Sequence, residues 1–199
     1  MVYHRVYLKF SKAFYCESCF LCIMTLDTLK RLLVVTGTPG AGKSTIAQLL
    51  VSEFGFVHID FHELIEKDPT LSSDFNKEKD CYDLDMDRVE ELVRAQLLEN
   101  PGKLMVLDTH VSQHLTAEII FAAIIVRCSD LKVLEERLAD RGYAAAKVKE
   151  NLDAEIFDIC HDETIELGVE TLVFDSAQGL NEGMVIEKVT ELLARNGLF

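Results

Sequence analysis

The most specific pattern in this chain is GTPGAGKS, at residues 37–44. It matches the pattern G-x-x-x-x-G-K-[ST] at every position, with an apolar run at 32–35 before it and a helical pattern at 43–53 after it. Glycines let backbone N–H groups close around phosphate oxygens, and the following helix turns its positive end toward them. The stretch therefore predicts a phosphate-binding loop between a strand and a helix.

The residues of this loop have separate parts in binding ATP. Lys43 has the length and charge to reach the β- and γ-phosphates, and the Ser44 hydroxyl is a ligand that suits Mg²⁺. We therefore expect Lys43 to be catalytic and Ser44 to hold the metal. The loop residues expected to bind ATP are Gly37, Gly40, Ala41, Gly42, Lys43, Ser44 and Thr45.

Short apolar runs alternate with helical patterns along the chain, and this order indicates an α/β domain with a parallel sheet and helices on both faces. The expected strands are 32–35, 56–59, 104–107, 121–126 and 171–174, and the expected helices are 43–53, 85–98, 130–140, 145–167 and 182–194. The polar stretch 60–84 is expected to form at most one short helix.

Composition limits the class of protein further. The chain has 199 residues, of which 49% are hydrophobic and 27% charged, so it suits one folded domain and is not disordered throughout. Its longest apolar run, 119–126, is far shorter than the ~20 residues of a membrane-spanning helix, so no membrane partner is expected. The six cysteines do not form the framework of a small secreted domain, which indicates a reducing compartment.

The formal net charge of −14 argues against broad binding to a nucleic-acid backbone. Two interpretations of this charge remain. It is a solvated acidic surface, or it attracts basic partners.

Residues 1–23 differ from everything after them, because they are rich in aromatic side chains and poor in acids. They fit neither a signal peptide nor an arginine-rich presequence, so we expect an extension outside a domain at 24–199, or an upstream start that cells do not use. Cys16, Cys19 and Cys22 have iron–sulfur spacing, but Leu26 stands where a fourth cysteine would complete it. No histidine is near enough to complete a zinc site, so the ligand set is incomplete.

Four residues outside the loop also suit phosphate chemistry. Asp108 ends an expected strand, where an acid can hold Mg²⁺ through water or can simply face solvent. His110 can orient an attacking group near the γ-phosphate, or it is a structural histidine. Arg137 and Arg141 share one helix face, which suits phosphates and a stacked base, and ion pairs with neighbouring acids are the alternative.

Several segments, in order along the chain, resemble one known family. They are the loop at 36–45, Asp-Cys at 80–81, LDMDRV at 84–89, Asp-Thr-His at 108–110, ERLADRGY at 136–143, and Asn151 with AEIF at 154–157. Over about residues 31–197 the chain is similar to the adenylate kinase isoenzyme 6 family. This resemblance implies a P-loop nucleoside monophosphate kinase fold, with a five-stranded parallel sheet, helices on both faces and a short lid.

The resemblance also implies roles for residues and segments. Arg141 would contact the ATP phosphates, Arg137 would lie near the adenine, and Asp108 with His110 would form a metal-and-water motif. A monophosphate-binding segment would cover about 60–84 and a lid about 140–150. The expected monophosphate-binding residues are Asp60, Glu63, Lys67 and Asp85, and the expected catalytic residues are Lys43, Asp108, His110 and Arg141.

Two activities follow from the resemblance. One is the Mg²⁺-dependent transfer of a phosphoryl group from ATP to AMP or another nucleoside monophosphate. The other is an ATPase of the nucleus and cytoplasm that acts in small ribosomal subunit maturation. It would be a monomer whose partner is a ribosomal protein with a basic tail, without sequence-specific binding to nucleic acid. A P-loop kinase of another small molecule is a third alternative.

The chain departs from ordinary adenylate kinases in three places. Residues 109–113 hold no arginine that could grip AMP. Glu66 stands where the family tends to have an arginine, and only the neighbouring Lys67 could substitute for it. The expected lid contains no second pair of arginines. The preferred phosphoryl acceptor is therefore open at the level of sequence.

Overall fold

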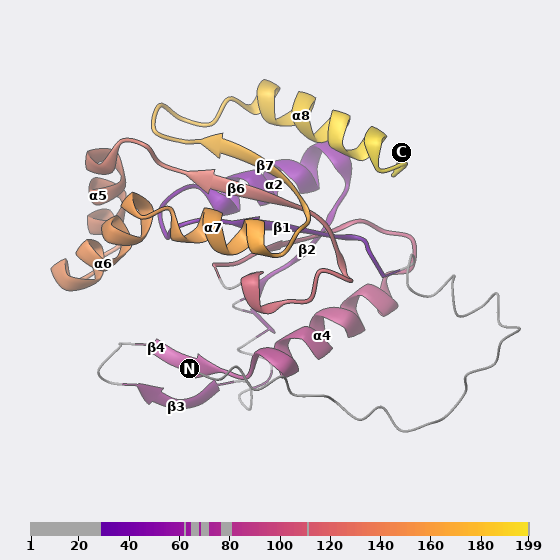
Figure 1. Ribbon diagram of the computed structural model, residues 1–199, viewed down its shortest axis with the longest axis horizontal. Coiled ribbons are helices and arrows are strands. Elements are labelled where there is room, and N and C mark those ends of the chain that lie inside the picture. The colour runs from indigo at the N-terminus through magenta and orange to yellow at the C-terminus, as the bar shows by residue number, and fades with distance from the viewer. Residues whose placement is uncertain are drawn as a thin grey trace, which may run out of the picture.

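The computed structural model describes residues 29–61, 63–64, 68, 72–76, 81–110 and 112–198. Its centre is a five-stranded parallel sheet in the order β2-β5-β1-β6-β7 (Figure 1). The strands are β1 Leu32–Thr36, β2 Val57–Ile59, β5 Met105–Asp108, β6 Ile120–Arg127 and β7 Glu170–Asp175. All five strands were expected from the apolar runs, and the parallel sheet confirms the fold class.

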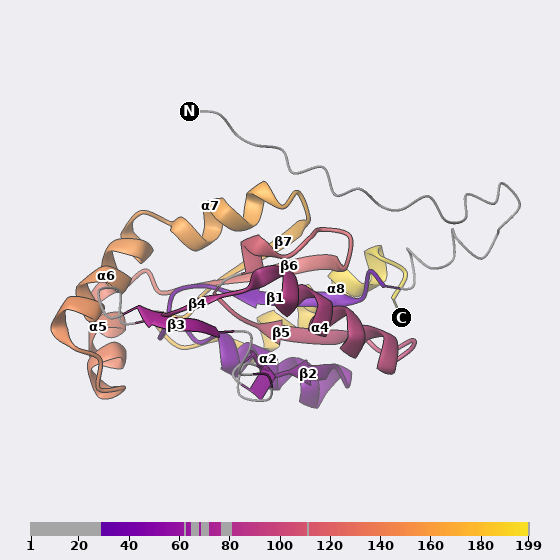
Figure 2. The ribbon, with the colours of Figure 1, turned by 90° about the horizontal axis from the view of Figure 1, so that it is seen from below.

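Helices cover both faces of this sheet because the strand side chains alternate between two apolar clusters. Leu33 and Val35 of β1 join the cluster that α2 and α8 cover, whereas Leu32 and Val34 join the cluster beneath α4. Figures 1 and 2 place α7 on the opposite side of the sheet from α2. The helices are α2 Lys43–Phe54, α4 Met86–Glu99, α7 Ile159–Glu166 and α8 Glu182–Arg195.

Two more helices form a hairpin at the carboxyl ends of the strands. They are α5 Leu131–Asp140 and α6 Ala145–Ile156. Asp130 caps α5, because its Oδ1 accepts hydrogen bonds from the backbone N–H of Lys132 at 3.0 Å and of Val133 at 3.4 Å. A small apolar cluster that includes Leu134, Leu138 and Val148 joins the two helices. The turn between them, residues 141–144, lies within the range of about 140–150 expected for the lid, and the rest of that range begins α6.

The stretch 60–84 differs from the expectation of at most one short helix. It contains two antiparallel strands, β3 Ser72–Asn76 and β4 Cys81–Leu84, which form a separate two-stranded sheet. Phe75 stands in register with Tyr82, and aromatic residues favour strands. The strands are short and polar, so they lack the apolar alternation by which a strand is recognised in a sequence.

The single long helix expected at 145–167 is also wrong, because the chain breaks into α6 and α7. Asp158, between them, has a φ of 57°, which lies in the left-handed region and ends the helix. Its carboxylate Oδ1 lies 3.2 Å from Arg127 Nε at the end of β6. Sequence periodicity misses this break, because no glycine or proline marks it.

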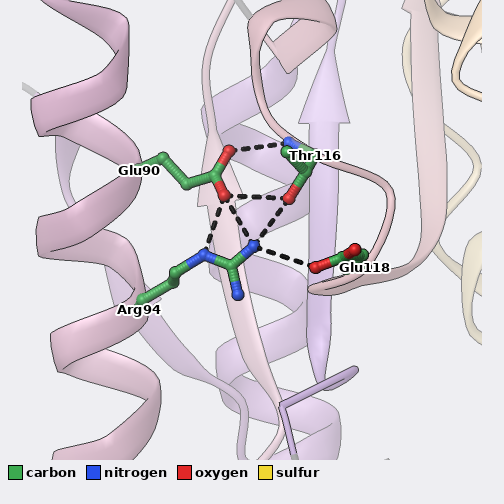
Figure 3. A network of polar contacts seen from close by, with 4 residues as sticks. All are labelled: Glu90, Arg94, Thr116 and Glu118. Atoms are coloured by element: carbon green, nitrogen blue, oxygen red, sulfur yellow. Dashed lines mark hydrogen bonds and ion pairs between the residues drawn. The ribbon is translucent and has the colours of Figure 1, made fainter. Parts of the chain in front are cut away.

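A polar cluster joins α4 to the loop that follows β5 (Figure 3). The Glu90 carboxylate accepts hydrogen bonds from the backbone N–H and the hydroxyl of Thr116, each at 2.8 Å, and from Arg94 Nε at 2.7 Å. Arg94 Nη2 also donates to Thr116 Oγ1 at 2.8 Å and lies 3.5 Å from a Glu118 carboxylate oxygen. We call these four residues the α4 clamp. Within the described part of the chain, no helix is long and apolar enough to cross a membrane.

Candidate active site

The phosphate loop connects β1 to α2 at the carboxyl edge of the sheet. Gly37 has a φ of 143°, and a Cβ atom added there would lie 2.1 Å from the carbonyl oxygen of Val126 on β6. Only glycine fits this close approach. Gly42 also has a positive φ, 108°, at the position directly before the helix. The loop glycines are therefore required by the backbone path that brings N–H groups to the start of α2.

Lys43 lies over this loop. Its Nζ donates hydrogen bonds to the carbonyl oxygens of Gly37 at 2.7 Å and of Thr38 at 3.2 Å. Burial lowers the pKa of Lys43 to about 8. The nearby charges act in both directions, because Asp108, Glu155 and Cys160 raise this pKa and Arg141 lowers it. These groups come from β5, α6, α7 and the end of α5, so all four elements surround the lysine.

Asp108 is the centre of a small polar group at the end of β5. Its Oδ2 accepts a hydrogen bond from Ser44 Oγ at 2.8 Å, and its Oδ1 lies 2.9 Å from His58 Nε2. The parallel register explains this arrangement, because β5 lies between β1 and β2 and all three end at one edge. Sequence analysis brought Ser44 and Asp108 together as metal residues, and the structure places them in direct contact.

His58 is the residue of this group that the sequence did not predict, since it has no ligand spacing with other residues. Its side chain is about one-third exposed, at 32%. The neighbouring strands β2 and β5 are separated by almost 50 residues, so nothing local in the sequence indicates that they pair. The only signal in the sequence was the position of His58, which lies in an expected strand, two residues before the polar stretch at 60–84.

His110 lies two residues beyond Asp108, just after β5, and its side chain is exposed. This places it at the same edge of the sheet as the phosphate loop. Its role near the γ-phosphate stays a prediction.

Arg137 lies in α5 and Arg141 follows its last residue. Arg137 Nη1 donates to Ser176 Oγ at 2.9 Å and to the carbonyl oxygen of Gly40 at 3.3 Å, and Nη2 donates to the Ser176 carbonyl at 2.8 Å. Arg141 ends α5 and is exposed, yet it lies near enough to lower the pKa of Lys43. Arg137 therefore contacts the phosphate loop through Gly40, and the role expected for Arg141 at the ATP phosphates stays a prediction.

A cavity of about 360 Å³ opens beside Ser176, between the end of β7 and the start of α8. Its wall includes Ser129, Asp175, Ala177 and Asn181. Asp175 Oδ1 shapes this wall by accepting hydrogen bonds from the backbone N–H of Ser129 at 3.1 Å and of Ala177 at 2.9 Å. The volume lies within the ~300–1,000 Å³ range of small-molecule pockets.

Three of the four expected monophosphate-binding residues, Asp60, Glu63 and Asp85, lie in the described part of the chain. Asp60 Oδ1 accepts a hydrogen bond from the Glu63 backbone N–H at 3.1 Å, and Asp85 Oδ1 caps α4 by accepting one from the Arg88 N–H at 3.1 Å. Both carboxylates therefore hold local backbone. Their contact with a monophosphate stays a prediction, and Lys67 lies outside the described residues.

Glu155 is a second residue that sequence reasoning missed. It is buried, and its carboxylate accepts hydrogen bonds from the Thr38 hydroxyl and from the Cys128 backbone N–H, the latter at 2.7 Å. The resemblance drew attention to residues 154–157 without giving Glu155 a role.

The structure does not test the cysteine run, whose ligand set is incomplete in the sequence. Cys16, Cys19 and Cys22 lie outside the described residues. In the described part, no three His, Cys, Asp or Glu side chains gather as a metal site would require.

Comparison with known proteins gives relatives over most of this chain. A family model described as an AAA domain matches residues 33–158. A Caenorhabditis elegans protein named adenylate kinase isoenzyme 6 homolog is 32% identical over 162 residues, covering 80% of this chain and 87% of the relative. A Schizosaccharomyces pombe protein with the same name is 31% identical over 134 residues, covering 67% of this chain and 74% of the relative.

Solved structures show the same fold at low identity. Shikimate kinase from Acinetobacter baumannii, in complex with shikimate, matches with a TM-score of 0.55 at 18% identity, over 85% of this chain and 96% of that chain. A sugar kinase from Janibacter matches with a TM-score of 0.54 at 18% identity, over 83% of this chain and 95% of that chain.

The five-stranded parallel sheet, with a phosphate loop after its central strand β1, has the P-loop nucleoside monophosphate kinase fold that these solved structures share. The relatives in worm and fission yeast narrow this class to one family. The chain belongs to the adenylate kinase isoenzyme 6 family.

Proposed function

We propose that this protein transfers the γ-phosphoryl group of Mg-ATP to AMP or a similar nucleoside monophosphate. The observation that carries the proposal is the contact of Ser44 with Asp108, 2.8 Å apart, beside the Lys43 ammonium at the end of the sheet. Phosphoryl transfer needs positioning and neutralisation of charge more than covalent chemistry. A lysine, a hydroxyl and a carboxylate around one phosphate loop supply these requirements.

The donor set of this site fits Mg²⁺. Ser44 and Asp108 offer a hydroxyl and a carboxylate oxygen side by side, and oxygen ligands are those that Mg²⁺ prefers. When bound, the ion would neutralise charge that develops on the phosphates. Ser44 and Asp108 would hold it, Asp108 in part through water.

The remaining residues act on the two substrates. Lys43 and Arg141 neutralise the ATP phosphates, and the loop N–H groups orient them. Arg137 holds Ser176 and Gly40 beside the open cavity and so shapes the region proposed for the adenine. The proposed acceptor site lies toward the segment at 60–84 and the first turn of α4.

A second proposed activity is ATP hydrolysis in an assembly role, with His110 orienting water. It is favoured by the exposed position of His110 at the end of β5 and by the net charge of −14, which suits a basic protein tail. We propose a small-subunit ribosomal protein as that partner, and the nucleus and cytoplasm as the location. His110→Ala should cut hydrolysis about 10²–10⁴-fold and AMP phosphorylation less, because AMP is held by its own segment.

One assay tests both activities. ADP and inorganic phosphate are measured with Mg-ATP alone and then with each nucleoside monophosphate added. Formation of ADP that depends on AMP, with little free phosphate, supports the kinase. If inorganic phosphate is released in an amount that no added monophosphate changes, the result would support the assembly ATPase instead. If the protein phosphorylates no nucleoside monophosphate and does not hydrolyse ATP, both proposed activities are overturned.

A further inference from the structure

Glu155 is a buried carboxylate in a position that the proposed chemistry does not use. Its side chain and that of Thr38 are almost fully buried, with relative exposures of 7% and 1%. A buried carboxylate is costly unless donors satisfy it. Glu155 has two donors, the Thr38 hydroxyl at its Oε2 and the Cys128 N–H at its Oε1.

These two hydrogen bonds join three elements. Thr38 is the second residue of the phosphate loop, Cys128 directly follows β6, and Glu155 lies in the last turn of α6. The same loop also meets β6 at Gly37, whose backbone packs against the Val126 carbonyl. One carboxylate therefore fixes the loop to the end of the sheet and to the helical hairpin that carries Arg137 and Arg141.

We propose that Glu155 is a positioning residue for ATP, which holds Thr38 so that the loop N–H groups keep the geometry that phosphates require. It does not touch the nucleotide itself. Its effect reaches ATP through Thr38 and through the position of α6 relative to the loop. The inference rests on the ATP-binding half of the proposed function and is independent of the phosphoryl acceptor.

The test is the dissociation constant for Mg-ATP, measured by calorimetry on the full chain and on five variants. Glu155→Ala should raise this dissociation constant about tenfold or more, because the Thr38 hydroxyl in the phosphate loop loses its acceptor. Glu155→Gln should stay within about threefold of wild type, because its amide can accept from Cys128 and donate to the Thr38 oxygen. Measurement at about pH 6.5, below the Lys43 pKa of about 8, limits the effect that loss of the Glu155 charge has on the protonation of Lys43.

Thr38→Val and the double variant with Glu155→Ala complete a mutant cycle. Thr38→Val removes the hydroxyl that donates to Glu155, while the hydrogen bond from the Cys128 N–H to Glu155 remains. This variant alone should therefore weaken ATP binding. If Glu155 acts through Thr38, the double variant should weaken binding by less than the two single effects combined.

Asn151→Ala is the matched control. Asn151 is also buried on α6, but its amide donates within the helix, to the Lys147 carbonyl at 2.7 Å. It should lower the melting temperature without changing ATP affinity.

Three results would overturn the inference. They are Glu155→Ala with wild-type affinity, equal losses in Glu155→Ala and Asn151→Ala, and fully additive effects of Glu155 and Thr38. If Glu155→Ala does not fold, a Thr38→Val variant with unchanged affinity overturns it as well. Failure of the wild-type chain to bind Mg-ATP would instead refute the proposed function, so the two outcomes are distinguishable.

Discussion

At the scale of single residues, the loop motif was enough to predict that Lys43, Ser44 and the glycines lie together. They are close in the sequence, and the motif requires a particular residue type at each of these positions. His58 and Glu155 were not predicted from the sequence, and the reason is physical. Each makes its contact across the fold, His58 with a residue 50 positions away and Glu155 with one 117 positions away. Such contacts depend on strand order and helix packing, which a single sequence does not display.

The lowered pKa of Lys43, about 8, predicts how ATP affinity changes with pH. Bound phosphates favour the charged ammonium, so the pKa in the complex is higher than in the free protein. Between the two values, binding takes up a proton and affinity falls as pH rises. Calorimetry from about pH 7 to about pH 10 should show affinity declining above about pH 8. Lys43→Arg keeps its charge and should lose this decline, and a flat wild-type profile would contradict the account.

The contact between His58 and Asp108 predicts that replacing His58 changes the Mg²⁺ requirement. Its Nε2 lies 2.9 Å from Asp108 Oδ1, so it fixes the carboxylate whose other oxygen meets Ser44. His58→Ala should raise the Mg²⁺ concentration for half-maximal activity about tenfold, as expected when a partner of a metal-binding group is removed. ATP binding in the absence of Mg²⁺ should not change. His114→Ala, also at an exposed histidine, is the control, and an unchanged Mg²⁺ requirement in His58→Ala would refute this role.

At the scale of elements, the five strands of the sheet and the helices α2, α4, α5 and α8 followed from apolar periodicity and capping residues. The β3–β4 hairpin did not, because its strands are short and lack an apolar face in the sequence. The break between α6 and α7 did not either. It depends on Asp158 adopting a left-handed conformation beside Arg127, and local helix propensity gives no sign of it.

The α4 clamp gives a prediction about stability. Glu90 is largely buried in it, with a side-chain exposure of 14%, and satisfies three donors from α4 and the loop at Thr116. Glu90→Ala should lower the free energy of unfolding by about 2 kcal/mol, because it removes a largely buried carboxylate that accepts hydrogen bonds from Arg94 and from Thr116. Chemical denaturation measures this change directly.

The control for the clamp is a solvent-exposed pair on α8. Lys188 and Glu191 lie 3.7 Å apart and are both about half exposed. Glu191→Ala should change the free energy of unfolding by no more than about 0.5 kcal/mol. Equal effects of Glu90→Ala and Glu191→Ala would show that the clamp adds nothing beyond an ordinary surface ion pair.

At the scale of the whole molecule, parallel strands bring residues from distant parts of the sequence to one edge of the sheet. Lys43, Asp108, His58 and Arg137 come from four different elements, and all lie around the loop between β1 and α2. The α5–α6 hairpin lies at this same edge (Figure 1). This arrangement, together with membership of the adenylate kinase isoenzyme 6 family, supports the proposal that the protein transfers a phosphoryl group from ATP.

The most direct test of that claim follows the γ-phosphate itself. The protein is incubated with Mg²⁺, AMP and ATP that carries a label on the γ-phosphate, and the labelled products are separated. We predict that the label appears in the β-phosphate of ADP formed from AMP, and that Lys43→Ala reduces this transfer more than tenfold. Label found only in free phosphate, or transfer that survives in Lys43→Ala, would contradict the account.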